Sequence, residues 1–210
     1  MTVKLTPAVQ NLLPSLGVFA LEIHDVSMLA MVERGEPELD IHRTGEINDW
    51  RETYRKMGLN ASDHRSSIEA LLRRPASYTG IRFVDLCNSV SIHCKATIGA
   101  YDRRQVDTLT VRLSLAEDRF DAIGRPIQIK PGVPSYCDDL GIVCYGLNHR
   151  DSQRTAIRTD TRHALVISEY VSQRTRVASI RAMTAIQALC SASKATCTAI
   201  MPWHEWDETV

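Results

Sequence analysis

The order of the predicted elements in this chain of 210 residues predicts an α+β fold in one domain, residues 1–210. Helical patterns come early, several short alternating strands follow, and one more helix closes the chain. A doubly wound α/β protein would instead alternate strands and helices regularly. An apolar content of 44% supports one sizeable core, and the sequence shows neither internal repeats nor low-complexity linkers.

The chain is predicted to begin with a strand and an acidic extension. Val18–Val26 (VFALEIHDV) alternates as a half-buried strand does. Residues 1–49 hold three basic and eight acidic side chains, so this extension has a net charge of −5 while the whole chain is neutral. The remainder is therefore basic, which is compatible with a nucleic-acid partner.

Three helices are predicted next. The first two are each bounded by a capping side chain and a helix breaker. Their predicted limits are Asn48 or Asp49 to Gly58, and Ser62 or Asp63 to Pro75. Val84–His93 forms the third helix, and Asn88 lies within its apolar stripe. A buried amide without a partner costs about 1–3 kcal/mol, so Asn88 is predicted either to clamp the structure or to line a pocket.

The second half is predicted to form short strands separated by Gly, Pro and Asp turn signals. Leu109–Leu115 alternates most clearly. The other predicted strands are residues 126–130, 135–138, 142–147 and 164–168. Arg174–Leu189 is predicted as an amphipathic closing helix with Val177, Ile180, Met183, Ile186 and Leu189 on one face. The aromatic and acidic tail, residues 201–210, is left open between packing as a strap and fraying.

Composition narrows the class of protein. No apolar run approaches the roughly 18 residues of a membrane span, and the first residues lack the order of a signal peptide, so we expect a cytoplasmic protein. The six cysteines fall in three pairs, each seven residues apart. That spacing fits neither the usual metal sites nor a disulfide framework, so we expect free buried thiols and neither a metal nor a cofactor.

Six separate segments, spread in order over residues 50–169, carry a family resemblance. They are WRETYRKMG (50–58), RSSIEALLRR (65–74), FVDLCNSVS (83–91), GAYD (99–102), PG with YCDD (131–132 and 136–139) and NHRDSQRTAI (148–157). Together they resemble the editing domain in the beta subunit of bacterial phenylalanyl-tRNA synthetase, and resemble its freestanding homologues still more.

The resemblance implies a layered β/β/α sandwich and a function on tRNA. The synthetase domain hydrolyses the ester of tyrosine wrongly attached to phenylalanine tRNA, and freestanding members are thought to act in trans or simply to bind tRNA. We therefore expect a deacylase that binds mischarged tRNA, without DNA or a membrane as partner. The alternatives are a non-catalytic RNA-binding or amino-acid-binding protein, and a hydrolase of another small ester or amide. Nothing resembles the catalytic core of a ligase.

The resemblance also supplies the candidate site. An aminoacyl ester is already activated, so a positioned water and a few donors for the oxyanion suffice, without a covalent nucleophile. The candidate catalytic residues are Asn88, His149, Asp151 and Ser152, with His149 as a possible general base. The candidate substrate-binding residues are Tyr101, Asp102, Tyr136, Arg150, Thr155 and Glu169.

Structural readings of the same residues stay open. Asp102 is equally suited to capping a helix after GAYD. Asp151 and Ser152 equally suit a turn clamp, with Arg150 as an internal salt-bridge partner. Glu169, at the end of a predicted strand, is typical of a solvated edge carboxylate.

The basic residues are candidates for phosphate contacts, because arginine pairs with phosphate in a bidentate way. Arg55, Arg73, Arg74 and Arg154 are the predicted RNA-binding residues. The alternative is that such arginines form solvated faces and pair with carboxylates of the chain itself.

The sequence departs from the synthetase pattern at three places. Gly99 stands where synthetase editing domains typically have histidine, Val133 replaces an acidic residue, and His149 replaces an aromatic one. The resemblance therefore does not transfer the synthetase's catalytic detail at Gly99.

Overall fold

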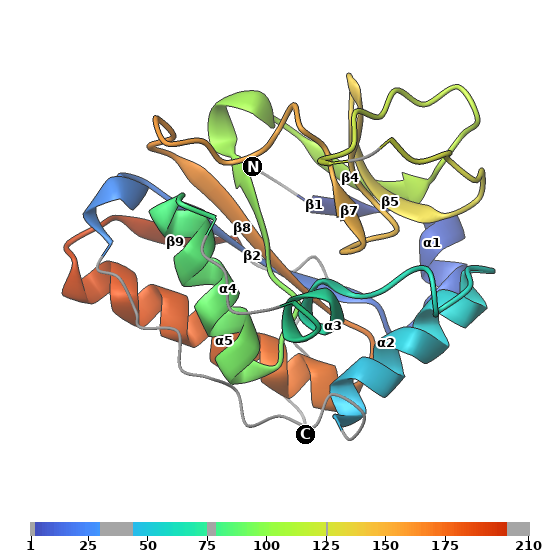
Figure 1. Ribbon diagram of the computed structural model, residues 1–210, viewed down its shortest axis with the longest axis horizontal. Coiled ribbons are helices and arrows are strands. Elements are labelled where there is room, and N and C mark those ends of the chain that lie inside the picture. The colour runs from blue at the N-terminus through green and yellow to red at the C-terminus, as the bar shows by residue number, and fades with distance from the viewer. Residues whose placement is uncertain (1–2, 30–43, 75–78, 125, 201–210) are drawn as a thin grey trace.

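The computed structural model describes residues 3–29, 44–74, 79–124 and 126–200, and it has three layers (Figure 1). Two β-sheets face each other, and two long helices cover the outer face of the second sheet. The predicted α+β class, its β/β/α layering and its closing helix are confirmed.

The first sheet has five strands in the order β1-β4-β5-β6-β7. They are β1 (Val3–Leu5), β4 (Leu109–Leu113), β5 (Pro134–Asp138), β6 (Gly141–Tyr145) and β7 (Arg150–Asp151). Strands β4 to β7 form an antiparallel meander, whereas β1 pairs in parallel with β4.

The second sheet has four antiparallel strands in the order β3-β8-β2-β9. They are β3 (Gly99–Asp102), β8 (Ala164–Tyr170), β2 (Gly17–Ile23) and β9 (Cys197–Ile200). Successive side chains of a strand point to opposite faces. In β8, Leu165 and Ile167 accordingly enter the core between the sheets, while Ala164 and Val166 face the helices. Glu169, two residues after Ile167, points to the same face of the sheet as Leu165 and Ile167.

Five α-helices lie within the described residues: α1 (Pro7–Leu12), α2 (Gly45–Lys56), α3 (Ser67–Leu72), α4 (Arg82–Cys94) and α5 (Gln173–Ala192). Two short 3-10 helices cover Val26–Met28 and Arg103–Gln105. Helix α5 packs on β8 and β2, and α4 packs beside α5. None of the helices in the described ranges combines the length and hydropathy needed to cross a bilayer.

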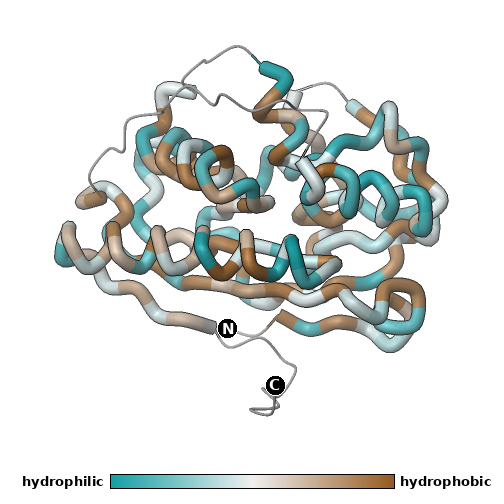
Figure 2. The backbone as a smooth tube through the Cα atoms, turned by 90° about the horizontal axis from the view of Figure 1, so that it is seen from below, coloured by the Kyte–Doolittle hydropathy of each residue, from teal (hydrophilic) through white to brown (hydrophobic). Residues whose placement is uncertain are grey.

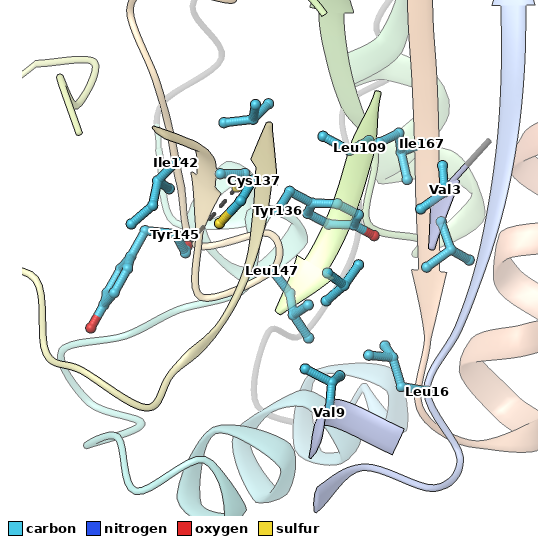
Figure 3. Close-up of a cluster of buried hydrophobic side chains, with 14 of the residues drawn as sticks. Val3, Val9, Leu16, Leu109, Tyr136, Cys137, Ile142, Tyr145, Leu147 and Ile167 are labelled. Atoms are coloured by element: carbon cyan, nitrogen blue, oxygen red, sulfur yellow. Dashed lines mark hydrogen bonds between the residues drawn. The ribbon is translucent and has the colours of Figure 1, made fainter. Parts of the chain in front are cut away.

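The layers enclose two apolar cores. Figure 3 shows the core between the sheets, where Leu109, Tyr136 and Ile167 meet. The second core lies between β2 and β8 and the helices α4 and α5. Hydrophobic and hydrophilic residues alternate along the helical tubes, as expected for helices with one buried face (Figure 2).

The predicted helix starts were wrong for the first two helices. Helix α2 begins at Gly45, so Asp49 lies inside it, and the carboxylate of Asp49 accepts a 2.6 Å hydrogen bond from the Ser172 hydroxyl instead of capping α2. Helix α3 begins at Ser67, because Asn60 holds the preceding residues in a turn through its bonds to Ser62 and Asp63. Gly58 adopts φ +70° after α2, as predicted for a stop residue.

The predicted end of the second helix, Pro75, lies outside the described residues, and α3 ends at Leu72. The tail, residues 201–210, also lies outside them. Residues 126–130 do not form the predicted strand. Their last backbone amide donates instead to the Tyr145 hydroxyl.

The buried face of α5 differs from the prediction. Val177 and Ile180 are 38% and 36% exposed, while Ala178 and Ala182 are buried against the sheet. Small side chains allow the helix axis to approach the sheet closely, so the larger β-branched residues lie at the edge of the contact. Met183 and Ile186 are buried as predicted.

Ser172 fixes the start of α5. Its hydroxyl accepts from the Thr175 backbone amide at 3.1 Å and donates to Asp49 of α2. We expect Ser172→Ala to lower the free energy of unfolding by about 1–2 kcal/mol, because a cap and a link to α2 are lost together. Chemical denaturation measures this change.

Ser191→Ala is the matched control, because that hydroxyl donates to a carbonyl four residues earlier on the exposed side of α5. It is expected to change stability by less than about 0.5 kcal/mol. Equal effects of the two substitutions would contradict a special role for Ser172.

Candidate functional site

Polar side chains gather inside the apolar layer between the two sheets. We name this set the inter-sheet polar cluster; its members are Tyr54, Thr97, Tyr101, Tyr136, Asn148, Asp151 and Glu169. They come from α2, the segment between α4 and β3, and strands or strand ends of both sheets. Tyr101, Tyr136, Asp151 and Glu169 are predicted site residues, and the structure brings them together.

Glu169 is at the centre of the first half of the cluster. Its side chain is 1% exposed, so the reading as a solvated edge carboxylate is wrong. Oε2 accepts a 2.8 Å hydrogen bond from the Thr97 hydroxyl and a 3.4 Å contact from the Asn148 amide. The side-chain oxygen Oδ1 of Asn148 accepts in turn from the Tyr54 hydroxyl at 3.0 Å. Burial raises the pKa of Glu169 above its ordinary value.

Asp151 is at the centre of the second half. Its Oδ1 accepts a 3.1 Å hydrogen bond from the buried Tyr101 hydroxyl. Desolvation raises the pKa of Asp151, although contacts with the Cys144 thiol and Tyr101 oppose the rise. Desolvation also raises the pKa of Cys144, so this thiol is a poor nucleophile.

Two buried oxygens of the cluster have no hydrogen-bond partner within the described residues. They are the Tyr136 hydroxyl and Oε1 of Glu169. The Tyr136 hydroxyl and the Glu169 carboxyl lie close enough for a weak interaction of hydrogen-bond type that lowers the pKa of Glu169, but the pair falls short of the geometry of a well-formed hydrogen bond. Because unpaired buried polar atoms are costly, these two oxygens mark the place where a polar group of a ligand would be held best.

Gly99, which stands where synthetase editing domains typically have histidine, leaves room for the Tyr101 side chain. A Cβ atom at Gly99 would lie 2.7 Å from the Tyr101 hydroxyl oxygen, which is too close. The Tyr101 ring therefore fills the space beside Gly99, and its hydroxyl reaches Asp151 from there. Any larger residue at position 99 would displace that hydroxyl.

His149 lies beside the cluster, in contact with the α2–α3 region. Its Nδ1 is 3.1 Å from the Arg65 carbonyl oxygen, and its ring lies 4.7 Å from that of His64. A carbonyl can only accept, so Nδ1 carries the proton and Nε2 the lone pair in the neutral ring. Burial, together with nearby positive groups, lowers the pKa of His149 to about 4. It is thus neutral at pH 7 and a weak base.

The structure does not bring Asn88 to this cluster. Asn88 is half-buried on α4, in the helical layer, so the expectation of a fully buried amide was wrong. Within the described part of the chain no hydrogen bond joins it to residues 148–155. A helix of 3.6 residues per turn gives each residue a different direction, and Asn88 lies at the edge of the apolar face rather than in it.

Asp102 has the capping role that the sequence left open. It accepts from the Arg104 backbone amide at 3.0 Å, from the Arg104 guanidinium at 2.8 Å and from the Thr161 hydroxyl at 2.8 Å. The hydrogen bonds from Arg104, opposed by partial burial, lower the pKa of Asp102 to about 2. These contacts hold the 3-10 helix rather than a cavity wall.

The segment after β7 forms a clamp. The Ser152 amide donates to the Val143 carbonyl at 2.9 Å, and the Ser152 hydroxyl accepts from the Arg154 amide at 3.3 Å. Thr155 is buried beside it and contacts the Ser152 carbonyl at 3.5 Å. Arg150, expected as the internal salt-bridge partner, makes no ion pair within the described ranges.

Two of the four arginines predicted to bind RNA are engaged within the chain. Arg154 donates to both oxygens of Asp138 at 2.8 Å, and Arg73 donates to the buried Glu69 at 3.0 Å. Arg55 and Arg74 are exposed and make no side-chain hydrogen bond in the part that the structure describes. The last two remain candidates for phosphate contacts.

Sequence reasoning missed Tyr54, Thr97 and Asn148 as members of the cluster. Asn148 belongs to a family-like motif, so the sequence could have indicated it as a site residue. Tyr54 occupies an ordinary apolar position of a helix, which gives no such indication. Thr97 follows a helix end and carries no signal. Among the described residues no group of three or more His, Cys, Asp or Glu side chains is placed to hold a metal ion.

The lowered pKa of His149 predicts a pH-dependent stability. The ordinary value is 6.5 and the folded value about 4, so between these values the unfolded chain binds more protons and stability rises with pH. His149→Asn keeps a donor for the Arg65 carbonyl without a titrating ring. We expect the unfolding free energy of this variant to rise less steeply with pH than that of the unaltered chain. Over pH 4–6.5 the two rises should differ by at most about 3 kcal/mol.

Urea denaturation at several pH values measures the difference between the two proteins. Comparing slopes cancels the opposite contribution of the carboxyls of Asp151 and Glu169, whose pKa values are raised. Parallel pH profiles for the variant and the unaltered chain would contradict the assignment.

Comparison with known proteins identifies the family. The family model of the B3/4 domain matches residues 49–191. No curated protein matches the chain. A similar solved structure is an N-terminal fragment of the phenylalanyl-tRNA synthetase beta subunit from Pyrococcus horikoshii, with a TM-score of 0.51 and 10% identity, covering 97% of this chain and 54% of the fragment. The likeness extends over the whole fold, the family match covers more than half of the chain, and the chain belongs to the B3/4 domain family.

Proposed function

We propose that this protein binds mischarged tRNA and hydrolyses the ester that joins the amino acid to it, acting in trans. The observation that carries the proposal is the pair of unpartnered buried oxygens, the Tyr136 hydroxyl and Oε1 of Glu169, inside a B3/4 domain. A solved structure similar to this chain is part of a phenylalanyl-tRNA synthetase, which supports tRNA as the partner.

The chemistry of an aminoacyl ester matches these groups. Its α-ammonium group lies next to the reactive carbonyl, and a buried carboxylate is the natural partner for such a cation. Glu169 has a raised pKa, and a carboxylate of higher basicity is better suited to take a proton from an attacking water near neutral pH. In this proposal Glu169 holds the ammonium or activates the water, and the Tyr136 hydroxyl donates to the ester oxygen.

The second half of the cluster supports the same reaction. Tyr101 is held by Asp151 and fills the place beside Gly99, so it would shape the wall against the amino-acid side chain. His149, with a neutral ring and a free Nε2, would accept a hydrogen bond rather than act as a strong base. Ser152 and Thr155 would support this wall through their clamp.

A binding protein without chemistry is the second candidate. Gly99 favours it, because synthetase editing domains typically carry histidine at that place, and Asn88 lies away from the cluster. A screen of deacylation against a panel of aminoacyl-tRNAs separates the two. If no aminoacyl-tRNA of the panel is hydrolysed faster than it decays spontaneously, the protein is a binding protein without catalytic activity.

Conservative substitutions at the centre of the cluster test the site. We expect Glu169→Gln and Tyr136→Phe each to lower hydrolysis more than tenfold, about 1.4 kcal/mol of transition-state stabilisation. Glu169→Gln is expected to keep or raise thermal stability, because a buried carboxyl becomes a neutral amide. Turnover and melting temperature are measured on the same samples.

Asp102→Asn is the matched control, because its contacts to Arg104 and Thr161 are structural. It should lower stability by about 1–3 kcal/mol with turnover per folded molecule unchanged. If Glu169→Gln behaves in the same way as this control, the cluster is a structural clamp and not an active site.

The exposed arginines predict how affinity for tRNA responds to salt. Each neutralised phosphate releases counterions, so affinity should fall as salt rises. The double substitution of Arg55 and Arg74 by alanine should weaken binding and reduce the slope of log affinity against log salt by about 1–2. Filter binding at several salt concentrations measures both quantities.

Arg154→Ala is the comparison variant, because its guanidinium is held by Asp138. It should lower stability while the salt slope stays the same. A tRNA affinity that is indifferent to salt would rule out the phosphate-contact model.

A further inference from the structure

A cavity of about 340 Å³ opens where three helices meet, outside the inter-sheet polar cluster. The start of α2 contributes Glu46, the end of α4 contributes His93, Cys94 and Lys95, and the first turns of α5 contribute Arg174 and Arg181. We name it the helix-junction pocket. Figure 1 shows α2, α4 and α5 converging on the outer side of the second sheet.

The charged residues of the pocket lining are mostly positive. Lys95, Arg174 and Arg181 are cationic, and Glu46 is the one carboxylate among the lining residues. Arg174 is 3.6 Å from Asp49, whereas Lys95 and Arg181 make no ion pair within the described residues. Cations that have no carboxylate partner and share a concave surface attract an anion more strongly than scattered surface charges do.

The backbone places these cations for specific reasons. Lys95 has φ 57°, a left-handed conformation that ends α4 and turns the chain away from the helix axis. The guanidinium of Arg174 lies directly against Gly45, where any Cβ atom would overlap it. The absence of a side chain at Gly45 thus allows Arg174 to rest on the start of α2. The first turn of α5, a helix of 20 residues, adds the partial positive charge of a helix N-terminus.

The same chain segments connect the pocket to Glu169. Thr97, which donates to the Glu169 carboxylate, follows Lys95 by two residues, and Glu169 precedes Gln173 by four. The backbone of the pocket wall is therefore close to Glu169 along the chain, although the Glu169 side chain points between the two sheets and the pocket lies on the outer side of the second sheet.

We propose that the helix-junction pocket binds a phosphate group of the RNA strand near its aminoacylated end. This inference rests on the proposed function, and the phosphate contact would fix the position of the RNA strand on the protein. Arginine and lysine around a concave site match the charge and the hydrogen-bond acceptors of a phosphate.

Cys94 supplies a direct readout of occupancy. It is half-buried and lines the pocket, whereas Cys197, also half-buried, lies on β9 and is not among the lining residues. The rate of alkylation by iodoacetamide is measured at both cysteines by peptide mass spectrometry, with and without a saturating tRNA transcript. We expect tRNA to slow labelling of Cys94 at least fivefold and to leave Cys197 unchanged.

Charge reversal tests the same contact by affinity. Lys95→Glu combined with Arg181→Glu should weaken tRNA binding at least tenfold and remove the protection of Cys94. Arg158→Glu is the control, because that exposed arginine precedes β8, whereas the pocket is lined by the first turns of α5, which follow the end of β8. Melting temperatures confirm that the variants are folded, and a third variant, Arg181→Gln, removes charge without reversing it and should lie between.

The outcomes separate the pocket from the proposed function. If tRNA binds but neither protects Cys94 nor responds to the charge reversal, the pocket inference is overturned while tRNA binding stands. If tRNA does not bind at all, both fail. Pyrophosphate is the second probe: protection of Cys94 by pyrophosphate but not by tRNA would overturn the RNA assignment, since the pocket would then serve free phosphates.

Discussion

The burial of Glu169 is the constraint on which the arrangement of this fold depends most. A carboxyl in an apolar layer is tolerated only with hydrogen-bond partners, and here they come from distant parts of the chain. The Thr97 hydroxyl and the Asn148 amide reach its side chain, and the Ser179 hydroxyl of α5 donates to its carbonyl at 2.9 Å. One residue thereby ties both sheets to the helical layer.

This burial also explains what the sequence predicts well and what it does not. The alternation of Leu109–Leu115 and the turn signals between short strands report on local burial of a strand face, and most of those strands are present. β1, β3, β7 and β9 were missed: each is a short strand at an edge of its sheet, two to four residues long, and too short to show a period. Glu169 was misread as an edge carboxylate for a related reason, because alternation predicts its face but not what covers that face.

Helix faces were predicted less well because their burial depends on the partner. Val177 and Ile180 belong to an apolar stripe, yet Ala178 and Ser179 are buried because close approach to the sheet favours small residues. Asn88 shows the same limit, since its position in an apolar stripe predicts burial only if a neighbour covers it. The family-like motifs, by contrast, led to Tyr101, Tyr136 and Asp151 without any knowledge of their contacts.

The two carboxyls of the cluster share a desolvated environment. Desolvation raises the pKa of both, and the charge of Asp151 adds a smaller rise to the pKa of Glu169. Asp151 has the Tyr101 hydroxyl as a fixed donor, which favours its charged form, whereas Oε1 of Glu169 has no partner within the described residues. An ammonium group at this place would favour the carboxylate, whereas the phosphate that precedes it along an RNA strand would meet the cations of the helix-junction pocket.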